Sequence, residues 1–182
     1  MKNCMSNKLS RQRGFVEISL NMVLVVVAIL GGAALFIGIK MVGDAKAEAL
    51  FTGHRQIVDT LRSSYRNAAS FAGLSNTQAV TLKVAPRAWM SGASAIANNM
   101  GGTVTITPAT INTSNDGFQV AHALLNENNC NNFVNSIFPD AVTITVGSTQ
   151  VKAANASNIT VATLATACNN ASNTVTSVYG KY

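Results

Sequence analysis

The first hydrophobic pattern along the chain is an almost unbroken apolar stretch near the N-terminus. From Ile18 to Ile39 the only strongly polar side chains are Ser19 and Asn21. As an α-helix, these roughly 22 residues would extend about 33 Å, which is enough to cross the apolar core of a bilayer. Basic residues precede the stretch without any acid, whereas those that follow it are interleaved with acids. Residues 15–43 are therefore predicted to form a transmembrane helix with its N-terminus on the inner side.

The helical pattern continues beyond this stretch but becomes amphipathic, with apolar residues on one face only. One face carries apolar or half-polar residues at spacings of three and four, namely Leu50, His54, Ile57, Leu61 and Tyr65. Charged residues take the opposite side, and Gly73 is expected to end the helix. The pattern predicts that residues 44–73 are the amphipathic half of one long helix. His54 is interpreted as a half-buried helix residue and not as a catalyst.

The hydrophobic period changes after the long helix. Residues 74–102 are punctuated by proline and glycine, so we expect a loop region with short helical turns, in which Trp89 is a packing anchor. Apolar or β-branched residues then alternate with polar ones, which predicts strands at 104–107, 118–121, 142–146 and 174–179. Helical patterns lie between these strands at 126–138 and 159–168. Residues 103–182 are therefore expected to form an antiparallel sheet with one solvated face and short helices.

Charge adds little once the N-terminal segment is set aside. The sequence contains 13 Lys and Arg against 7 Asp and Glu, a formal net charge of +6. Four of the basic residues precede residue 14, and without them the net charge is +2. Since no other Lys/Arg cluster exists and aromatic residues are few, the pattern of phosphate recognition is missing from the sequence. Nucleic acid is not expected as a partner.

The cysteines and histidines limit the chemistry that the chain could carry. Cys4 lies in the N-terminal segment, which leaves Cys130 and Cys168 as a pair that outside the cytoplasm is most simply a disulfide. Zinc is a poor alternative, because no CxxC occurs and His54 and His122 lack ligand spacing. The sequence also lacks a nucleophile elbow and a phosphate-binding glycine loop. We therefore expect no metal site, no cofactor and no enzyme activity.

The start of the apolar helix carries a more specific motif. A basic leader with Lys2, Lys8, Arg11 and Arg13 ends at Gly14, and the helix begins directly at Phe15. At this junction the chain resembles the type IV pilins, and more narrowly the type IVb subfamily of enteric bacteria and of the thin pili of conjugative plasmids. The resemblance implies that a prepilin peptidase removes the leader, residues 1–14, and that Phe15 becomes N-methylated.

The same resemblance implies the fold and the role of the cysteines. Type IVb pilins are α+β proteins in which a long N-terminal helical spine packs on an antiparallel β-sheet, here in the globular head formed by residues 74–182. They also have one disulfide near the C-terminus, which bounds the segment called the D-region. This role falls on Cys130 and Cys168.

One position departs from the family pattern. The fifth residue of a mature pilin is usually Glu, read as pairing with the N-terminal amine of a neighbouring subunit, but this chain has Ser19 there and Glu17 as the nearest acid. Two residues correspond to about 200° around a helix, so Glu17 does not simply replace an acid at position 19. Two interpretations stay open. Glu17 is either a first-turn acid favoured by the helix dipole or the assembly partner of the Phe15 amine.

The function implied by the resemblance is that of a major pilin. The protein would first reside in the inner membrane and then self-associate through its apolar helix into an extracellular pilus on a Gram-negative bacterium. Implied partners are the prepilin peptidase, an assembly ATPase with its membrane platform, and an outer-membrane secretin. The sequence leaves open whether the pilus would serve adhesion, conjugation, aggregation or motility.

Two alternatives remain at this point. The chain could be a minor pilin or a secretion pseudopilin, which initiates or caps a filament without forming its bulk. It could also be a secreted or periplasmic binding domain whose conventional signal peptide is cleaved after Ala47. The apolar stretch is longer than usual for such a signal, and the amphipathic helix pattern continues across the proposed cleavage site.

Overall fold

The computed structural model describes residue 25 and residues 45–181 of the chain. The chain divides into two compact units, Met1–Asp44 and Ala45–Tyr182, and the fold described below is that of the second unit. The predicted leader and all but one residue of the predicted span lie outside the described residues, as do Gly14, Phe15 and Glu17. In the part that is described, no helix is both long and apolar enough to cross a membrane.

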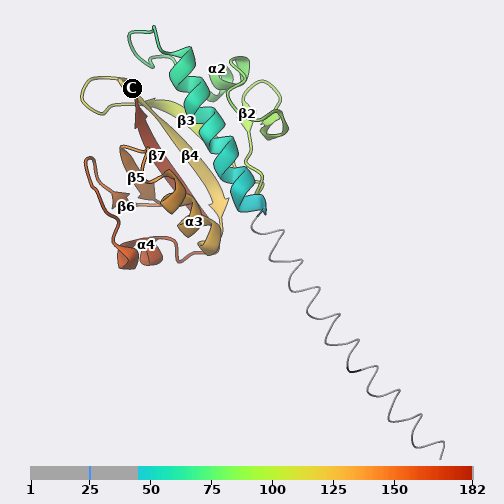
Figure 1. Ribbon diagram of the computed structural model, residues 1–182. Helices are drawn as coiled ribbons and strands as arrows, with labels where there is room; N and C mark the ends of the chain where they lie inside the picture. The colour runs from blue at the N-terminus through green and yellow to red at the C-terminus, as the bar shows by residue number, and fades with distance from the viewer. Residues whose placement is uncertain (1–24, 26–44, 182) are drawn as a thin grey trace, which may run out of the picture. The chain divides into compact units, whose positions relative to one another are not determined.

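An α-helix over residues 45–64 opens this unit and lies along one side of a β-sheet (Figure 1). Its predicted apolar face is buried, with exposed fractions of 2% or less for Leu50, His54, Ile57 and Leu61. The helix ends at residue 64, so the prediction that it extends to Gly73 is wrong. The reason is Phe71, whose backbone N–H donates to the carbonyl of Asn115 at 2.8 Å while its ring enters the core.

The sheet has five antiparallel strands in the order β3-β4-β7-β5-β6. These strands are β3 (Val104–Ala109), β4 (Gly117–Leu125), β5 (Thr143–Val146), β6 (Thr149–Lys152) and β7 (Asn173–Gly180). The last strand of the chain therefore lies in the middle of the sheet, between β4 and β5 (Figure 1). The sequence predicted four of these strands and missed β6, which is short and ends in a buried lysine.

Alternation along the strands separates a buried face from an exposed one. One row of register partners across four strands is fully buried, namely Ile106, Val120, Ser177 and Ile144. The adjacent row is partly or fully exposed, and consists of Thr105, Ala121, Thr176 and Thr145. Because successive side chains of a strand point to opposite faces, the helix-facing side collects the apolar residues. The prediction of an antiparallel sheet with one solvated face is confirmed.

Short elements connect the helix to the sheet. They are α2 (Asn76–Thr81), a 3-10 turn η1 (Arg87–Trp89) and the two-stranded ribbon of β1 (Met90–Ser91) and β2 (Ala95–Ile96). Asn76 protects the edge of β3, because its side-chain amide donates to the carbonyl of Val104 at 2.8 Å and accepts from the N–H of Ile106 at 2.7 Å. An edge strand with paired backbone groups is a poorer template for unwanted strand pairing.

Two further helices lie in the C-terminal half, α3 (Glu127–Ile137) and α4 (Val161–Ala167). Both were predicted, with ends within a few residues of those observed. Asn126 caps α3 by accepting the N–H of Asn129 at 2.9 Å. The buried side of α3 then follows the helical period with Cys130, Phe133, Val134 and Ile137.

Candidate functional site

The C-terminal half is closed by a disulfide between α3 and α4. Cys130 lies on α3 and Cys168 is the C-cap residue of α4, with 5.7 Å between their Cα atoms. Both cysteines are fully buried. The segment that they bound contains β5 and β6, so the crosslink joins the helix before these two strands to the helix after them. The predicted disulfide is therefore present.

Side chains around the crosslink hold its two ends in place. The amide of Asn173 donates to the carbonyls of Leu125, Cys168 and Asn170 at 2.8 to 3.2 Å, which links the ends of β4 and α4 to β7. At the other end of α3, the ammonium of Lys152 donates to the carbonyl of Phe138 at 2.5 Å. A cation is favourable there because the last carbonyls of a helix carry partial negative charge. Burial lowers the pKa of this lysine from its usual value.

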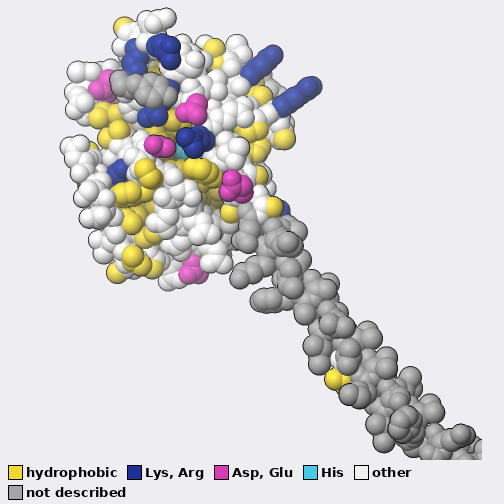
Figure 2. Space-filling view, viewed as in Figure 1, with side chains coloured by type: hydrophobic (Ala, Val, Ile, Leu, Met, Phe, Trp, Pro, Cys, Tyr) yellow, Lys and Arg dark blue, Asp and Glu magenta, His cyan; other side chains and the backbone are white. Residues whose placement is uncertain are grey.

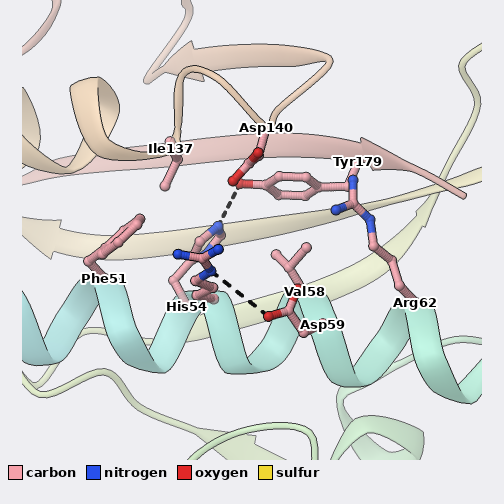
Figure 3. Close-up of a pocket in the computed structure, with 9 residues that line it drawn as sticks. Phe51, His54, Val58, Asp59, Arg62, Ile137, Asp140 and Tyr179 are labelled. Atoms are coloured by element: carbon pink, nitrogen blue, oxygen red, sulfur yellow. Dashed lines mark hydrogen bonds and ion pairs between the residues drawn. The ribbon is translucent and has the colours of Figure 1, made fainter. Parts of the chain in front are cut away.

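A pocket of about 210 Å³ lies between the helix of residues 45–64, the end of α3 and the end of β7. Figure 3 shows Phe51, Val58 and Arg62 of this helix on one side, with Ile137 and Tyr179 opposite. Its rim carries both signs of charge, from Arg55, Asp59, Arg62 and Asp140. On the face seen in Figure 2, acidic and basic side chains likewise lie among a majority of neutral ones.

Three of the four charged side chains of the rim, Arg55, Asp59 and Arg62, have partners within the head. Arg55 and Asp59 form an ion pair at 4.0 Å, four residues apart on the helix. Arg62 donates to the carbonyl of Gly180 at 3.2 Å, and its guanidinium lies 5.6 Å from the centre of the Tyr179 ring. In the described part of the chain, no group of three or more histidine, cysteine, aspartate or glutamate side chains could hold a metal ion. The rim therefore has the chemistry of a packing contact between helix and sheet.

Beneath the pocket lies a buried polar network that the sequence did not reveal. Nδ1 of His54 lies 2.9 Å from Nε2 of His122, and Nε2 of His54 lies 2.6 Å from the hydroxyl of Tyr179 (Figure 3 shows the second contact). All three side chains are at most 2% exposed. His54 is thus fully buried, and the prediction that it is half-buried is wrong. The network connects the helix of residues 45–64 to β4 and β7.

Burial controls the ionisation of this network. It lowers the pKa of His54 well below its usual value, and the neighbouring His122 lowers it further. Burial alone lowers the pKa of His122 to about 3. It also raises the pKa of Tyr179, because the anion would lose its hydration. At neutral pH all three side chains are therefore uncharged.

The sequence carried part of the signal for this network. His54 falls on the apolar face of the helix, and His122 follows Val120 at the spacing of the buried face of β4. Two polar residues at positions predicted to be buried should have hydrogen-bond partners. Their pairing could not be found without the three-dimensional arrangement, because the two histidines lie 68 residues apart.

The chain belongs to the PilS N-terminal family, whose model matches residues 44–179. Its fold is similar to that of a type IVb pilin from Salmonella typhi, with a TM-score of 0.58 at 14% identity, over 72% of this chain and 97% of that one. It is also similar to TcpA, a type IV pilin from Vibrio cholerae El Tor biotype, with a TM-score of 0.58 at 16% identity, over 75% and 99% of the two chains. No curated protein matches the sequence.

At these identities the solved structures establish a shared fold, and the family match establishes membership. The resemblance to type IVb pilins, which the sequence indicates at the leader and the start of the apolar helix, is confirmed. The α+β class and the helix packed on an antiparallel sheet are confirmed with it.

Proposed function

We propose that this protein is a pilus subunit, and more narrowly the major pilin of a type IVb-like pilus. The observation that carries the proposal is the family match over residues 44–179, which coincides with a pilin-like head. The head has a helix packed on an antiparallel sheet and a C-terminal region bounded by the Cys130–Cys168 disulfide. These features belong to a structural protein, and we propose no catalytic role.

The N-terminal part of the proposal rests on the sequence. Residues 1–14 would be a leader that is cleaved between Gly14 and Phe15, after which Phe15 would be N-methylated. Residues 15–43 would anchor the subunit in the inner membrane and then form the core of the filament through helix–helix packing, and the helix over residues 45–64 would be its amphipathic continuation. Glu17 would compensate the new N-terminal amine during assembly, because an unpaired charge in apolar surroundings is costly.

One observation disfavours the alternative of a conventional signal peptide cleaved after Ala47. The helix of the head already includes residues 45–47. The carbonyl of Lys46 accepts a hydrogen bond of 2.6 Å from the amide of Asn99, in the loop between β2 and β3. Cleavage after Ala47 would remove this contact and the first turn of a helix that packs on the sheet. A leader that ends at Gly14 leaves the whole helix intact.

The remaining partners follow from the proposed pathway. The subunit would be processed by a prepilin peptidase, extracted from the inner membrane by an assembly ATPase and its platform, and exported through an outer-membrane secretin. The finished protein would then be an extracellular filament of many copies of itself.

Filaments sheared from the native host test the proposal. If the protein is the major pilin, it is the principal polypeptide of the sheared fraction, and deletion of its gene removes the filaments. A chain present only in trace amounts in otherwise normal filaments would identify a minor pilin. A chain found only as a free periplasmic or secreted protein would contradict the pilus assignment.

A further inference from the structure

The buried His54–His122 contact occupies a central position in the packing of helix and sheet. His54 belongs to the helix of residues 45–64, His122 to β4 and Tyr179 to β7. The three side chains form a continuous chain of contacts of 2.9 and 2.6 Å. In the described residues, Nδ1 of His122 is a buried nitrogen without any hydrogen-bond partner. Both nitrogens of His54 therefore have a hydrogen-bond partner, whereas one nitrogen of His122 has none.

The number of protons decides whether these contacts can exist. In the neutral pair, one imidazole donates across the 2.9 Å contact and the other accepts. One added proton could be held if His54 donated from both nitrogens, to His122 and to Tyr179. A second proton would place two N–H groups against each other, which breaks the contact between His54 and His122. The geometry is compatible with the neutral pair and incompatible with the doubly protonated pair.

Among the described residues, the neighbours of His122 carry no negative charge that would compensate an added proton. Its register partners on the two neighbouring strands are Val104 and Val175. The ring of Phe133 from α3 lies 5.0 Å away, and that of Trp89 from η1 lies 6.0 Å away. A cation at this position would be buried against aliphatic and aromatic side chains, at a cost that no neighbouring carboxylate offsets.

The charged groups that face His54 lie on the rim of the pocket. The helix contributes Arg55, Asp59 and Arg62, and the loop after α3 contributes Asp140. Asp59 is already paired with Arg55, and within the described residues neither carboxylate is hydrogen-bonded to or ion-paired with an imidazole. The two arginines add positive charge to the same side. Protonation of His54 would therefore also be poorly compensated.

From this arrangement we propose that the His54–His122 pair is a pH-sensitive lock between the helix of residues 45–64 and the sheet, closed while both imidazoles are neutral and opened when both are protonated. The lock acts within the head and does not depend on polymerisation. Opening separates the face of the helix that carries His54 from β4 and exposes the apolar residues packed beside it.

The pH range follows from the direction of the two shifts. Both histidines have a lower pKa in the folded chain than in the unfolded one. The unfolded chain therefore binds more protons below about pH 6.5, and stability falls as the pH decreases from there towards about 3. For each unit by which the pH falls in this range, one histidine raises the unfolding equilibrium constant by up to about tenfold, and the two together raise it by up to about 100-fold.

The first experiment observes the two rings directly. The chain contains only two histidines and one tryptophan, so labelling the histidines with ¹⁵N gives two assignable rings and Trp89 gives one fluorescent reporter. The full chain is studied in an uncharged detergent from about pH 7.5 down to about pH 4. We expect both rings to stay neutral until they change together with the Trp89 fluorescence in one cooperative transition. A ring that titrates near its ordinary pKa while the fold stays intact would overturn the proposal.

The second experiment measures how many protons the histidines account for. Urea unfolding of the full chain in the same detergent gives the unfolding equilibrium constant at each pH. The slope of its logarithm against pH equals the number of protons taken up on unfolding. Near pH 5 we expect this number to be about two larger for the wild type than for the double variant His54→Gln/His122→Gln. Each single variant should lose about one proton. Tyr179→Phe is the matched control, because it removes a hydrogen bond and keeps both histidines, so the slope should persist.

Equal slopes in the wild type and the double variant would contradict the lock. If the double variant does not fold, the single variants and the ring titration of the wild type still decide between the two outcomes.

Discussion

Gly53 is the position at which the smallest change should produce the most informative loss of stability. It lies within the helix of residues 45–64, and the indole of Trp89 packs directly over it. A Cβ atom placed at Gly53 would lie 2.4 Å from Cη2 and 2.5 Å from Cζ2 of this ring. Gly53→Ala therefore forces the helix and η1 apart or moves the indole out of its site.

The expected magnitude combines two opposing effects. In an unobstructed helix interior, replacing glycine with alanine stabilises by about 0.5–1 kcal/mol. Overpacking of a filled core costs about 1–3 kcal/mol, and Trp89 is 6% exposed and has little room to move. The difference is a loss of about 0–2.5 kcal/mol, and we expect Gly53→Ala to lower the free energy of unfolding by about 1 kcal/mol.

The assay is urea unfolding of residues 45–182, followed by circular dichroism. A double-mutant cycle with Trp89→Leu separates the steric effect from helix propensity. Without the indole, Gly53→Ala should become stabilising by about 0.5–1 kcal/mol. If Gly53→Ala stabilises the protein while Trp89 is present, the close packing of helix and turn inferred from the structure is refuted.

Three further predictions concern the disulfide, the N-terminus and an acidic turn. Replacing Cys130 and Cys168 with serine should lower the unfolding free energy by about 4 kcal/mol in urea titrations, because the crosslink restricts the unfolded chain. Glu17→Ala should give processed, membrane-resident protein with few or no pili in electron micrographs, whereas Ser19→Ala should have a smaller effect. The wild type should lose stability as the pH falls below about 4, and Asp116→Asn should lack this part of the pH dependence in an acid titration of the fold. The carboxylate of Asp116 accepts hydrogen bonds from the backbone N–H groups of Ile111, Asn112 and Thr113, and these bonds lower its pKa to about 2. The stability is therefore present above the ordinary carboxyl pKa and disappears as the pH approaches 2.

Each of these predictions has an outcome that contradicts it. Free thiols in protein isolated from the periplasm or from filaments would show that the cysteines are not paired in the exported form. Normal piliation of Glu17→Ala would assign that carboxylate to the helix dipole. An unchanged acid transition in Asp116→Asn would mean that the turn does not contribute to acid stability.

Much of the head could be predicted from the sequence because its helices and strands are amphipathic, with apolar residues on one face and polar residues on the other. The period of the residues from Leu50 to Leu61 predicted the buried helix face, and the alternation at 118–121 and 174–179 predicted two central strands. These patterns arise because one face of each element meets the core and the other does not. The cysteine pair was also predictable, since two cysteines remain after the leader is excluded.

The errors occur where a local pattern depends on a distant partner. The helix was predicted to continue to Gly73, but Phe71 packs against Tyr65 and Phe118, with ring centres 4.9 and 5.0 Å away. β6 was missed because Lys152 reads as a solvent residue, whereas its ammonium is held by the carbonyls of Phe138 and Ala141. In both cases a contact from another element outweighs the local preference.

The candidate site was harder to predict than the fold. Neither histidine has a partner near it in sequence, so their shared hydrogen bond follows only from packing the helix on β4. The predicted N-terminal residues Gly14, Phe15 and Glu17 stay predictions, because they lie outside the described part of the chain.

The assignment as a pilus subunit is best tested by the intact mass of the protein from native filaments. We predict a polymerised chain that begins at Phe15, carries one added methyl group and has lost two hydrogens through the bond between Cys130 and Cys168. A mature chain that begins at Glu48, recovered as a soluble secreted protein, would contradict the assignment as a pilus subunit.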